Sequence, residues 1–412
     1  MTVFSELRLR PADAERWSWD ASITARLVLA SVVMFSLLVG ANLASPLYPL
    51  LETELGITSL GVTIAFASYV VALVAVLMLA GHWSDHIGRR AALVLAVLVG
   101  LAGGLVFANA DNLFMLCAGR VLQGVAVGLA TGASSAALRE LLPYRPEWAS
   151  RFTLLSSSGG VAAGPAIGGL LSQLPGAAST PFLVHAAVLL LLLVPLWLLK
   201  ARPASRPAEG PRPFSVLAPR RPSVSREARG AFWLASTVGF LSFAVFGFSL
   251  SLAPGYFAAV MHADSRPMIG VLAGLTLGAS ALSQLLSVHN GFAVPAGLGV
   301  LGFSVILVGL AASSDSPVLL VAASLSAGVG QGIAFRLVFN DVAGKVEASG
   351  HAQIISTVYV ITYLGSAVPV IGLGFAASIV GLGIAAGIFT VLCGLAAIIL
   401  AAVSLRGMLR RS

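Results

Sequence analysis

Residues 91–108 read AALVLAVLVGLAGGLVFA, a run without one polar side chain. An α-helix rises 1.5 Å per residue, so this run covers about 27 Å, close to the hydrocarbon thickness of a bilayer. Because backbone groups in lipid must bond within their own segment, the run predicts a membrane-spanning helix. The whole 412-residue chain has a similar composition: it is 58% hydrophobic and 10% charged, with a mean hydropathy of +0.96. Soluble domains carry about 25% charged residues. The composition therefore excludes a water-soluble enzyme, a secreted disulfide scaffold and a disordered protein.

Further long apolar stretches lie between charged or Pro- and Gly-rich breaks, and they lack the two-residue alternation of a membrane β-barrel. The sequence predicts an all-α integral membrane protein with twelve transmembrane helices. The predicted spans are 27–50, 60–80, 91–109, 113–137, 151–173, 181–199, 231–257, 267–288, 292–312, 317–338, 351–375 and 381–404.

The longest break, 200–230, is rich in Pro and Arg and cannot bury enough apolar area to fold, so it is typical of a linker. The predicted organisation is a cytoplasmic N-terminal tail at 1–26, a six-helix bundle at 27–199, a cytoplasmic linker at 200–230, a six-helix bundle at 231–404 and a cytoplasmic tail at 405–412.

Charge predicts the orientation. With the N-terminus inside, the outer loops hold one basic residue, Arg266. The inner segments hold the basic run 200–229 and also Arg8, Arg10, Arg16, Arg26, Arg89, Arg90, Arg139, Arg145, Arg151, Lys345, Arg406, Arg410 and Arg411. This bias is the positive-inside rule. It predicts a multi-pass protein of the inner (plasma) membrane with both termini cytoplasmic. It also explains the net charge of +8 without a nucleic-acid partner.

The two halves share a repeat. An offset of 204 residues relates Gly124 to Gly328, Gly128 to Gly332, Pro165 to Pro369 and Gly168 to Gly372. This spacing predicts two parallel six-helix pseudo-repeats. Every third span is almost free of polar side chains, and the sixth carries only His185. Such helices face lipid, whereas the more polar spans surround a central path. The pattern is typical of a transporter of small molecules.

Three motifs lie in this frame: GHWSDHIGRR at 81–90, RVLQG at 120–124 and GVAAGPAIGG at 160–169. Together and in this order they resemble the major facilitator superfamily, specifically its twelve-helix drug:proton antiporter branch. The resemblance implies the major facilitator fold and secondary active transport. It further implies proton-coupled efflux of small amphipathic or drug-like compounds by alternating access.

The first motif is a candidate conformational clamp, formed by Gly81, Asp85, Gly88, Arg89 and Arg90. The glycines would permit a tight turn with close backbone approach, and a carboxylate is favoured at a helix N-terminus. The resemblance implies that the Asp holds the two halves together on the cytoplasmic side, against the start of span 11 near 349–351. The alternative is an exposed anion balanced by the two arginines. His86 stands where the family usually has Arg.

The second motif, with Arg120, Gln123 and Gly124, is a candidate coupling site. Arg120 lies seven residues into span 4, where a permanent cation is costly and should have a partner or face water. The alternative is extension of its side chain to the outer interface. The resemblance implies a role in proton coupling.

The third motif places Gly160, Gly164 and Gly168 on one helix face, beside Pro165 and Gly169. Such a stripe allows close packing and sliding of helices. Packing alone would already be most of the mechanism, because rocking halves need smooth contacts. A possible substrate cavity comprises Asn42, Phe243, Phe246, Gln284, Gln331, Tyr359 and Tyr363. Each of these residues has the alternative of a helix–helix hydrogen bond or a packed aromatic side chain.

No Asp or Glu lies inside a predicted span, which departs from the drug:proton antiporter pattern of an intramembrane carboxylate. The remaining acids near the cavity mouths are Glu52, Glu54, Glu140 and Asp341, and we expect coupling through one of them with Arg120 as its partner. His185 lies near the outer end of a scaffold helix and is a weaker candidate.

The sequence shows no Walker loop, nucleophile elbow or metal-ligand spacing. We therefore expect no enzymatic activity, no cofactor and no metal. The expected partners are a small-molecule substrate, protons and the lipid bilayer, with the chain acting as a monomer. Two alternatives stay open: proton-coupled uptake (symport) of a small metabolite, and a non-transporting membrane receptor. The absence of a sensory domain in the sequence argues against the receptor.

Overall fold

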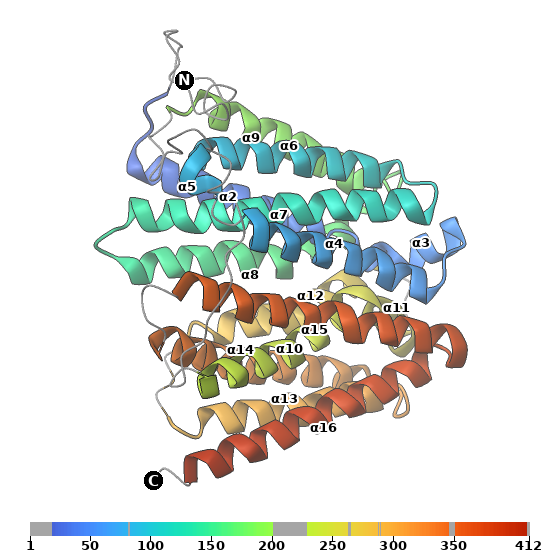
Figure 1. Cartoon of the computed structure of the whole chain (residues 1–412). Helices are drawn as coiled ribbons and strands as arrows, with labels where there is room; N and C mark the ends of the chain where they lie inside the picture. The colour runs from blue at the N-terminus through green and yellow to red at the C-terminus, as the bar shows by residue number, and fades with distance from the viewer. Residues whose placement is uncertain are drawn as a thin grey trace.

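The structure is a computed structural model that describes residues 19–80, 83–200, 229–262, 265–286, 288, 290–345 and 351–409. Within these residues, twelve helical segments are long and apolar enough to cross a membrane, which confirms the predicted fold class. The helices lie side by side in one bundle (Figure 1). Their bounds are α2 Ile23–Asn42, η1 Ser45–Leu47, α3 Tyr48–Leu55, α4 Ser59–Ala80, α5 Trp83–Ile87, α6 Arg89–Ala108, α7 Leu113–Leu141, α8 Pro146–Leu171, α9 Thr180–Leu198, α10 Arg229–Ser251, α11 Ala253–Met261, α12 Arg266–Ser283, α13 Ala293–Leu310, α14 Pro317–Lys345, α15 His351–Val380 and α16 Leu382–Leu409.

The first span of each half is broken near one end, where the sequence predicted a continuous helix. α2 stops at Asn42 and is followed by η1 and α3. α10 stops at Ser251, and α11 follows. Proline explains both breaks because it lacks the N–H that would continue the helix. Pro46 lies in η1, and Pro254 lies in the first turn of α11.

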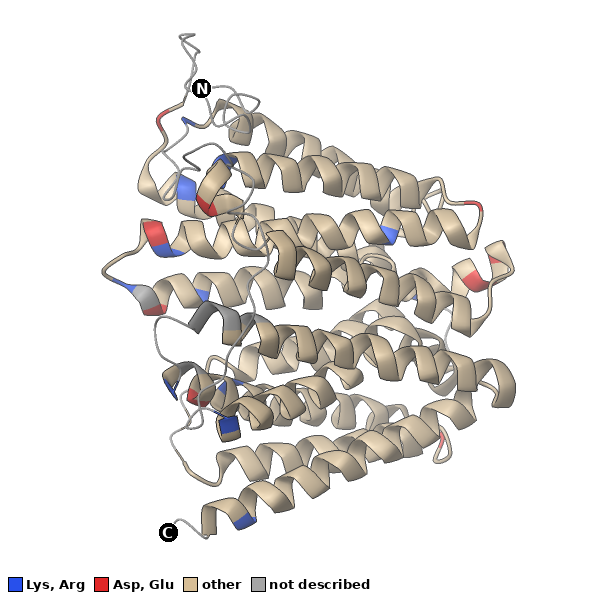
Figure 2. Ribbon diagram, in the orientation of Figure 1, with Lys and Arg blue, Asp and Glu red and all other residues tan. Residues whose placement is uncertain are grey.

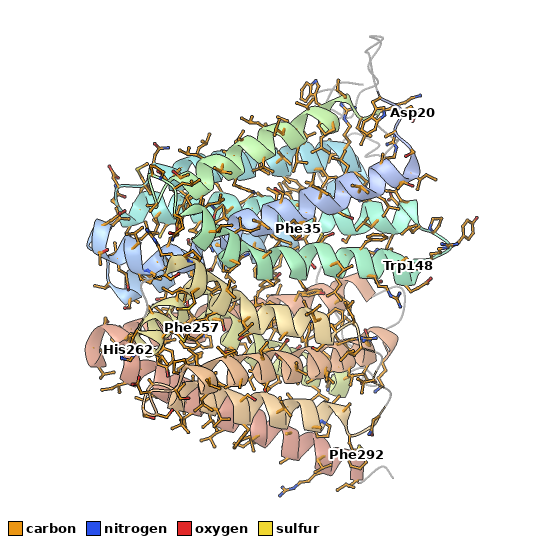
Figure 3. The ribbon with its side chains drawn as sticks, turned by 180° about the vertical axis from the view of Figure 1, so that it is seen from behind. Asp20, Phe35, Trp148, Phe257, His262 and Phe292 are labelled. Carbon is orange, nitrogen blue, oxygen red and sulfur yellow. The ribbon has the colours of Figure 1, made fainter. Side chains whose placement is uncertain are left out.

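Charge distinguishes the two ends of the bundle. Lys and Arg gather at one end, which we call the basic end and define by Arg26, Arg89 and Lys345 (Figure 2). Trp148 lies at this end and His262 at the opposite one (Figure 3). α2 begins and α16 ends at the basic end (Figure 1). Residues 1–18 of the predicted N-terminal tail, 201–228 of the linker and 410–412 of the C-terminal tail lie outside the described residues, so the domain boundaries remain predictions.

The helices of the two halves pack in the same pattern, as the repeat predicts. α7 packs on α4, and its counterpart α14 packs on α12. A Cβ added to Gly124 of α7 would meet the carbonyl of Tyr69 on α4. A Cβ added to Gly328 of α14 would meet the carbonyl of Thr276 on α12. Glycines 204 residues apart therefore give both helix pairs the same close approach.

Two helix pairs make the most extensive contacts between the halves: α8 with α12, and α4 with α15. A Cβ on Gly270 of α12 would meet the Pro165 carbonyl of α8, and a Cβ on Gly374 of α15 would meet the Thr63 side chain of α4. All four residues lie nearer the end opposite the basic end. These close contacts between the halves are therefore concentrated toward that end.

Candidate functional site

The predicted clamp loop contains a short helix, α5, instead of a tight turn. Gly88 then separates α5 from α6 with a φ of 90°, a conformation that favours glycine. A Cβ on Gly88 would meet nothing within 4 Å. The expectation that Gly88 permits close backbone approach is therefore wrong, and its positive φ is what requires glycine. Gly81 lies outside the described residues.

Arg89 connects three helices at the basic end. Its Nη2 atom lies 2.5 Å from Asp85 Oδ1 on α5 and 2.6 Å from Glu140 Oε1 on α7. Its Nε also donates to Glu140 Oε1 at 3.1 Å. These ion pairs hold α5, α6 and α7 of one half together. Two of the three residues near which Asp85 was expected to dock, 349 and 350 of 349–351, lie outside the described residues, so the clamp between the halves remains a prediction.

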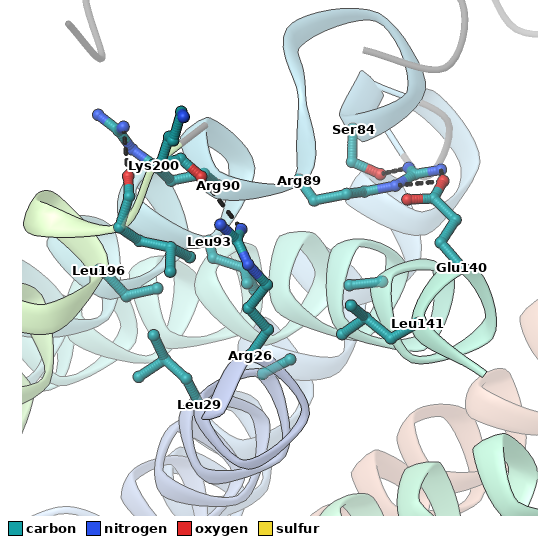
Figure 4. A pocket seen from close by; sticks show the side chains of 13 residues that line it. Arg26, Leu29, Ser84, Arg89, Arg90, Leu93, Glu140, Leu141, Leu196 and Lys200 are labelled. Carbon is teal, nitrogen blue, oxygen red and sulfur yellow. Dashed lines mark hydrogen bonds and ion pairs between the residues drawn. The ribbon is translucent and has the colours of Figure 1, made fainter. Parts of the chain in front are cut away.

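Arg90 of α6 is buried against the end of α9, apart from the Asp85–Arg89 pair. Its Nη1 donates to the Leu199 carbonyl at 2.6 Å, while Arg26 Nη1 donates to the Lys200 carbonyl at 3.0 Å. Both cations thus satisfy carbonyls just past a helix C-terminus, where the helix dipole favours positive charge. Arg26 and Arg90 line an open cavity together with Arg89 and Glu140 (Figure 4). The volume of this cavity is about 650 Å³ including open solvent.

Arg120 is 1% exposed and does not extend to the surface. Its Nη1 donates to the Ala41 carbonyl of α2 at 2.5 Å and to Gln123 Oε1 at 2.8 Å. The guanidinium lies over the Tyr69 ring, 4.5 Å from its centroid, a cation–π contact with α4. The alternative of extension to the interface is therefore excluded. Arg120 instead ties α7 to α2 and α4.

The four acids expected to partner Arg120 bind elsewhere or show no contact with it in the described structure. Glu140 pairs with Arg89, and Asp341 pairs with Lys345 at 2.8 Å. Glu52 accepts a hydrogen bond from Ser59 at 3.0 Å. Among the described residues, the oxygens that compensate the Arg120 charge are a backbone carbonyl and an amide, and no carboxylate forms an ion pair with it.

The glycine stripe of α8 lies directly on the backbone of α2. A Cβ on Gly160 would lie 2.7 Å from the Phe35 carbonyl, and one on Gly164 would lie 2.9 Å from the Val39 carbonyl. A Cβ on Gly168 would meet the Leu43 carbonyl. Three successive turns of α8 thus fit three successive turns of α2. The neighbouring Gly169 instead meets the backbone of Arg266 and Pro267, where α12 of the other half begins.

Four of the predicted cavity residues form one aromatic cluster in the second half. Its ring centroids are 5.6 Å apart for Phe243 and Phe246, 5.1 Å for Phe243 and Tyr363, and 6.5 Å for Tyr359 and Tyr363. The sequence interpretation missed two members, Phe335 and Phe339 of α14. Their four-residue spacing, which Tyr359 and Tyr363 share, was the available signal.

The three polar residues predicted to line the cavity take part in hydrogen bonds within one helix or between two helices. Asn42 Nδ2 donates to the Leu38 carbonyl at 2.8 Å in its own helix. Gln284 Nε2 donates to Ser280 Oγ at 3.1 Å, and Ser280 donates to Gln331 Oε1. The glutamines therefore join α12 to α14. These hydrogen bonds favour the alternative, a helix–helix hydrogen bond, over a role in lining a cavity.

Comparison with known sequences adds to this geometry. Residues 30–369 match the family model of the Major Facilitator Superfamily. The tetracycline resistance protein, class E, of Escherichia coli is 31% identical over 169 residues, 39% of this chain and 40% of that protein. The bacillibactin exporter of Bacillus subtilis is 32% identical over 104 residues, 24% of this chain and 26% of the exporter. The matched stretch covers less than half the length of either relative.

Solved structures with the same architecture match nearly the whole chain. A bacterial homologue of the human lysosomal transporter Spinster, in an inward-facing and unoccupied conformation, gives a TM-score of 0.72 over 93% of this chain and 95% of that chain, at 14% identity. The human organic anion transporter MFSD10 gives 0.63 over 93% of this chain and 100% of that chain, at 17% identity. At these identities the likeness shows the fold alone.

Proposed function

The chain belongs to the Major Facilitator Superfamily, and from this premise we propose that it exports small amphipathic, drug-like compounds by proton-coupled antiport. Family membership and twelve candidate spans make it a multi-pass membrane transporter and not an enzyme. In this proposal the basic end is cytoplasmic, both termini lie inside, and the membrane is the inner (plasma) membrane. Protons flow inward as substrate leaves, and the chain acts as a monomer.

The observation that carries the proposal is the double contact of α8. One face of α8 places Gly160, Gly164 and Gly168 on the backbone of α2. The carbonyls of Ala162 and Pro165, in the same turns, meet Gly274 and Gly270 of α12 in the other half. At these positions the glycines let the helix backbones approach closely, with no side chain of their own between them. This arrangement supports rocking of one half against the other, the motion that alternating access needs.

Export and substrate class have separate support. The α8 stripe is the motif that resembles exporters, and relatives that match parts of the chain are named as a tetracycline resistance protein and an exporter. The aromatic cluster of Phe243, Phe246, Tyr359 and Tyr363 with Phe335 and Phe339 offers ring faces for planar apolar groups and for cations. Amphipathic cations therefore suit it.

Ethidium flux into liposomes containing the purified protein tests the proposal. Ethidium is a permanent cation, so a pH gradient does not change its charge. An acid interior should accelerate ethidium uptake, because antiport exchanges it for outgoing protons. Symport would require the opposite gradient. Protein-free liposomes provide the control, and collapse of the gradient with nigericin should abolish the acceleration. If neither pH gradient changes the rate of ethidium flux, proton coupling is rejected.

A further inference from the structure

His185 is a buried titratable group that the proposed mechanism leaves unused. It lies on α9 and is 8% exposed. Its ring fits against Gly40 of α2, where any Cβ would overlap the imidazole. Its Nε2 lies 2.9 Å from the Ser36 carbonyl and 3.4 Å from Ser36 Oγ. The α2 helix thus provides both space and a hydrogen-bond partner for this ring.

These contacts fix which nitrogen carries the proton. A backbone carbonyl only accepts hydrogen bonds, so Nε2 must be the N–H donor to Ser36. Nδ1 of the neutral ring then keeps its lone pair. Within the described part of the chain, no hydrogen bond to Nδ1 is present. The ring can therefore take up one proton at Nδ1 without losing its bond to Ser36.

His185 and Arg120 share the groups around one small cavity. That cavity lies between α2, α6, α7 and α9. Its polar side chains are His185 and Gln123, and its wall includes Gly40 and Ala41. Gln123 and the Ala41 carbonyl are the two acceptors of Arg120. The imidazole and the two residues that accept from the guanidinium thus line the same cavity.

The other charged groups on α2 and α6 are distant. Arg26 of α2 lies fourteen residues from Gly40, about 21 Å along the helix. Arg89 and Arg90 begin α6 at the basic end, and Arg90 lies about 15 Å along that helix from Gly100 of the cavity wall. On α4, the Tyr69 ring stacks on the guanidinium of Arg120. Arg120 is therefore the charge that a protonated His185 would face.

We propose that His185 carries the coupled proton and that its protonation reaches Arg120 through Gln123 and the Gly40–Ala41 turn of α2. A proton on Nδ1 places a second cation beside this cluster and creates a new donor that competes for Gln123 Oε1. Both effects weaken the hold of Arg120 on α2. This inference rests on the proposed proton-coupled function.

The test uses two replacements that cannot be protonated, in the ethidium liposome assay. His185→Gln places its amide donor near the position of Nε2 and so keeps the bond to Ser36, whereas His185→Asn loses that bond. Both should lose about tenfold or more of the acceleration by an acid interior. His185→Gln should retain ethidium–ethidium exchange without a gradient, because exchange moves no net proton. His262→Gln, an exposed histidine at the opposite end from the basic end, is the matched control and should respond as wild type.

The outcomes separate the two proposals. If wild type ignores the gradient, the proposed proton coupling fails, and this inference fails with it. If wild type and His185→Gln respond equally to the gradient, proton carriage by His185 is overturned, whereas the proposed proton coupling of the protein stands. If His185→Gln responds and only His185→Asn fails, the hydrogen bond to Ser36 is what matters, and His185 is a packing residue. If His185→Gln loses exchange as well as the gradient response, the ring is needed structurally and the proposal is overturned.

Discussion

At the scale of single residues, Arg120 shows how a permanent cation is held inside this bundle without a carboxylate. Its charge is met by the Ala41 carbonyl, the Gln123 amide oxygen and the face of Tyr69. Such acceptors compensate only part of the desolvation of a guanidinium. The side chain is therefore held by geometry that a small change can disturb. That sensitivity is what the proposed coupling between His185 and Arg120 requires.

Replacing Arg120 with Lys tests this geometry while keeping the charge. An ammonium cannot reach both acceptors in the planar arrangement of a guanidinium and stacks less well on Tyr69. Each lost hydrogen bond to a charged group costs about 1.5–3 kcal/mol. We expect ethidium transport to fall about tenfold in Arg120→Lys, since about 1.4 kcal/mol is a factor of ten. Arg139→Lys, at an exposed site of the same helix, is the control and should transport normally. Normal transport by Arg120→Lys would show that charge alone suffices.

Asp85 and Glu140 provide a matched pair for the clamp hypothesis, because each is one partner of Arg89. Partly exposed ion pairs contribute about 0–1 kcal/mol, so Asp85→Asn and Glu140→Gln should both reach normal membrane abundance. If Asp85 also closes the halves, Asp85→Asn should lower ethidium transport about threefold or more, and Glu140→Gln much less. Equal effects would confine the role of Asp85 to the ion pairs within its own half.

These residues show which part of the site the sequence predicts. The cost of a buried cation predicts that Arg120 needs partners, but its acceptor at Ala41 lies 79 residues away and appears only in the fold. Phe243 and Tyr363 were predicted to share a site, whereas Phe335 joins them only because α14 packs on α10. The sequence interpretation treated His185 only as part of a scaffold helix. Its contact with α2 is also non-local and appears only in the fold.

At the scale of elements, α8 shows how glycine position decides helix packing. Gly168 and Gly372 occupy equivalent places in the repeat, 204 residues apart, beside Pro165 and Pro369 respectively. A Cβ on Gly168 would meet the Leu43 backbone, but a Cβ on Gly372 would meet nothing within 4 Å. The same sequence feature therefore serves close packing in α8 and leaves open space in α15.

This difference predicts opposite effects of one substitution. Gly168→Ala forces a methyl group against the α2 backbone and should destabilise the protein by about 1–3 kcal/mol. Gly372→Ala meets no obstacle and should stabilise its helix by about 0.5–1 kcal/mol. Thermal unfolding of the two purified variants in the same detergent measures the difference. Equal unfolding temperatures would mean that α8 and α2 do not pack as closely as the structure shows.

Element boundaries were predictable only where the local sequence decides them. Pro46 and Pro254 signal the breaks after α2 and α10, yet hydropathy alone extended both spans across them. Gly88 was expected to permit close backbone approach, whereas its positive φ is what requires glycine. The helical turns of α5 were not predicted because they lie in a short polar segment without apolar periodicity.

At the scale of the whole molecule, one interface occurs twice. The repeat relates α8 to α15 and α12 to α4, so the α8–α12 contact and the α15–α4 contact are equivalent. Both place a glycine against the opposite half: Gly270 on Pro165, and Gly374 on Thr63. The sequence predicted the repeat but not this pairing, which depends on how the halves dock. Alternating access requires both contacts to loosen together when the end opposite the basic end opens.

Cross-linking one of these contacts tests that requirement. A Cβ on Gly374 would lie 2.7 Å from Thr63 Cγ2, so cysteines at the two positions are close enough for a disulfide, whose Cβ atoms are about 3.5–4.5 Å apart. In a background with Cys117→Ala and Cys393→Ala, oxidised Thr63→Cys/Gly374→Cys should lose ethidium transport, and reduction should restore it.

Val76→Cys/Gly128→Cys is the matched control, since Gly128 packs on Val76 within one half, with the added Cβ 2.9 Å from the Val76 Cβ. A disulfide there leaves the halves free to rock, and transport should persist. Undiminished transport by the fully cross-linked Thr63–Gly374 pair would show that the halves need not separate at this end, and the rocking mechanism would fail.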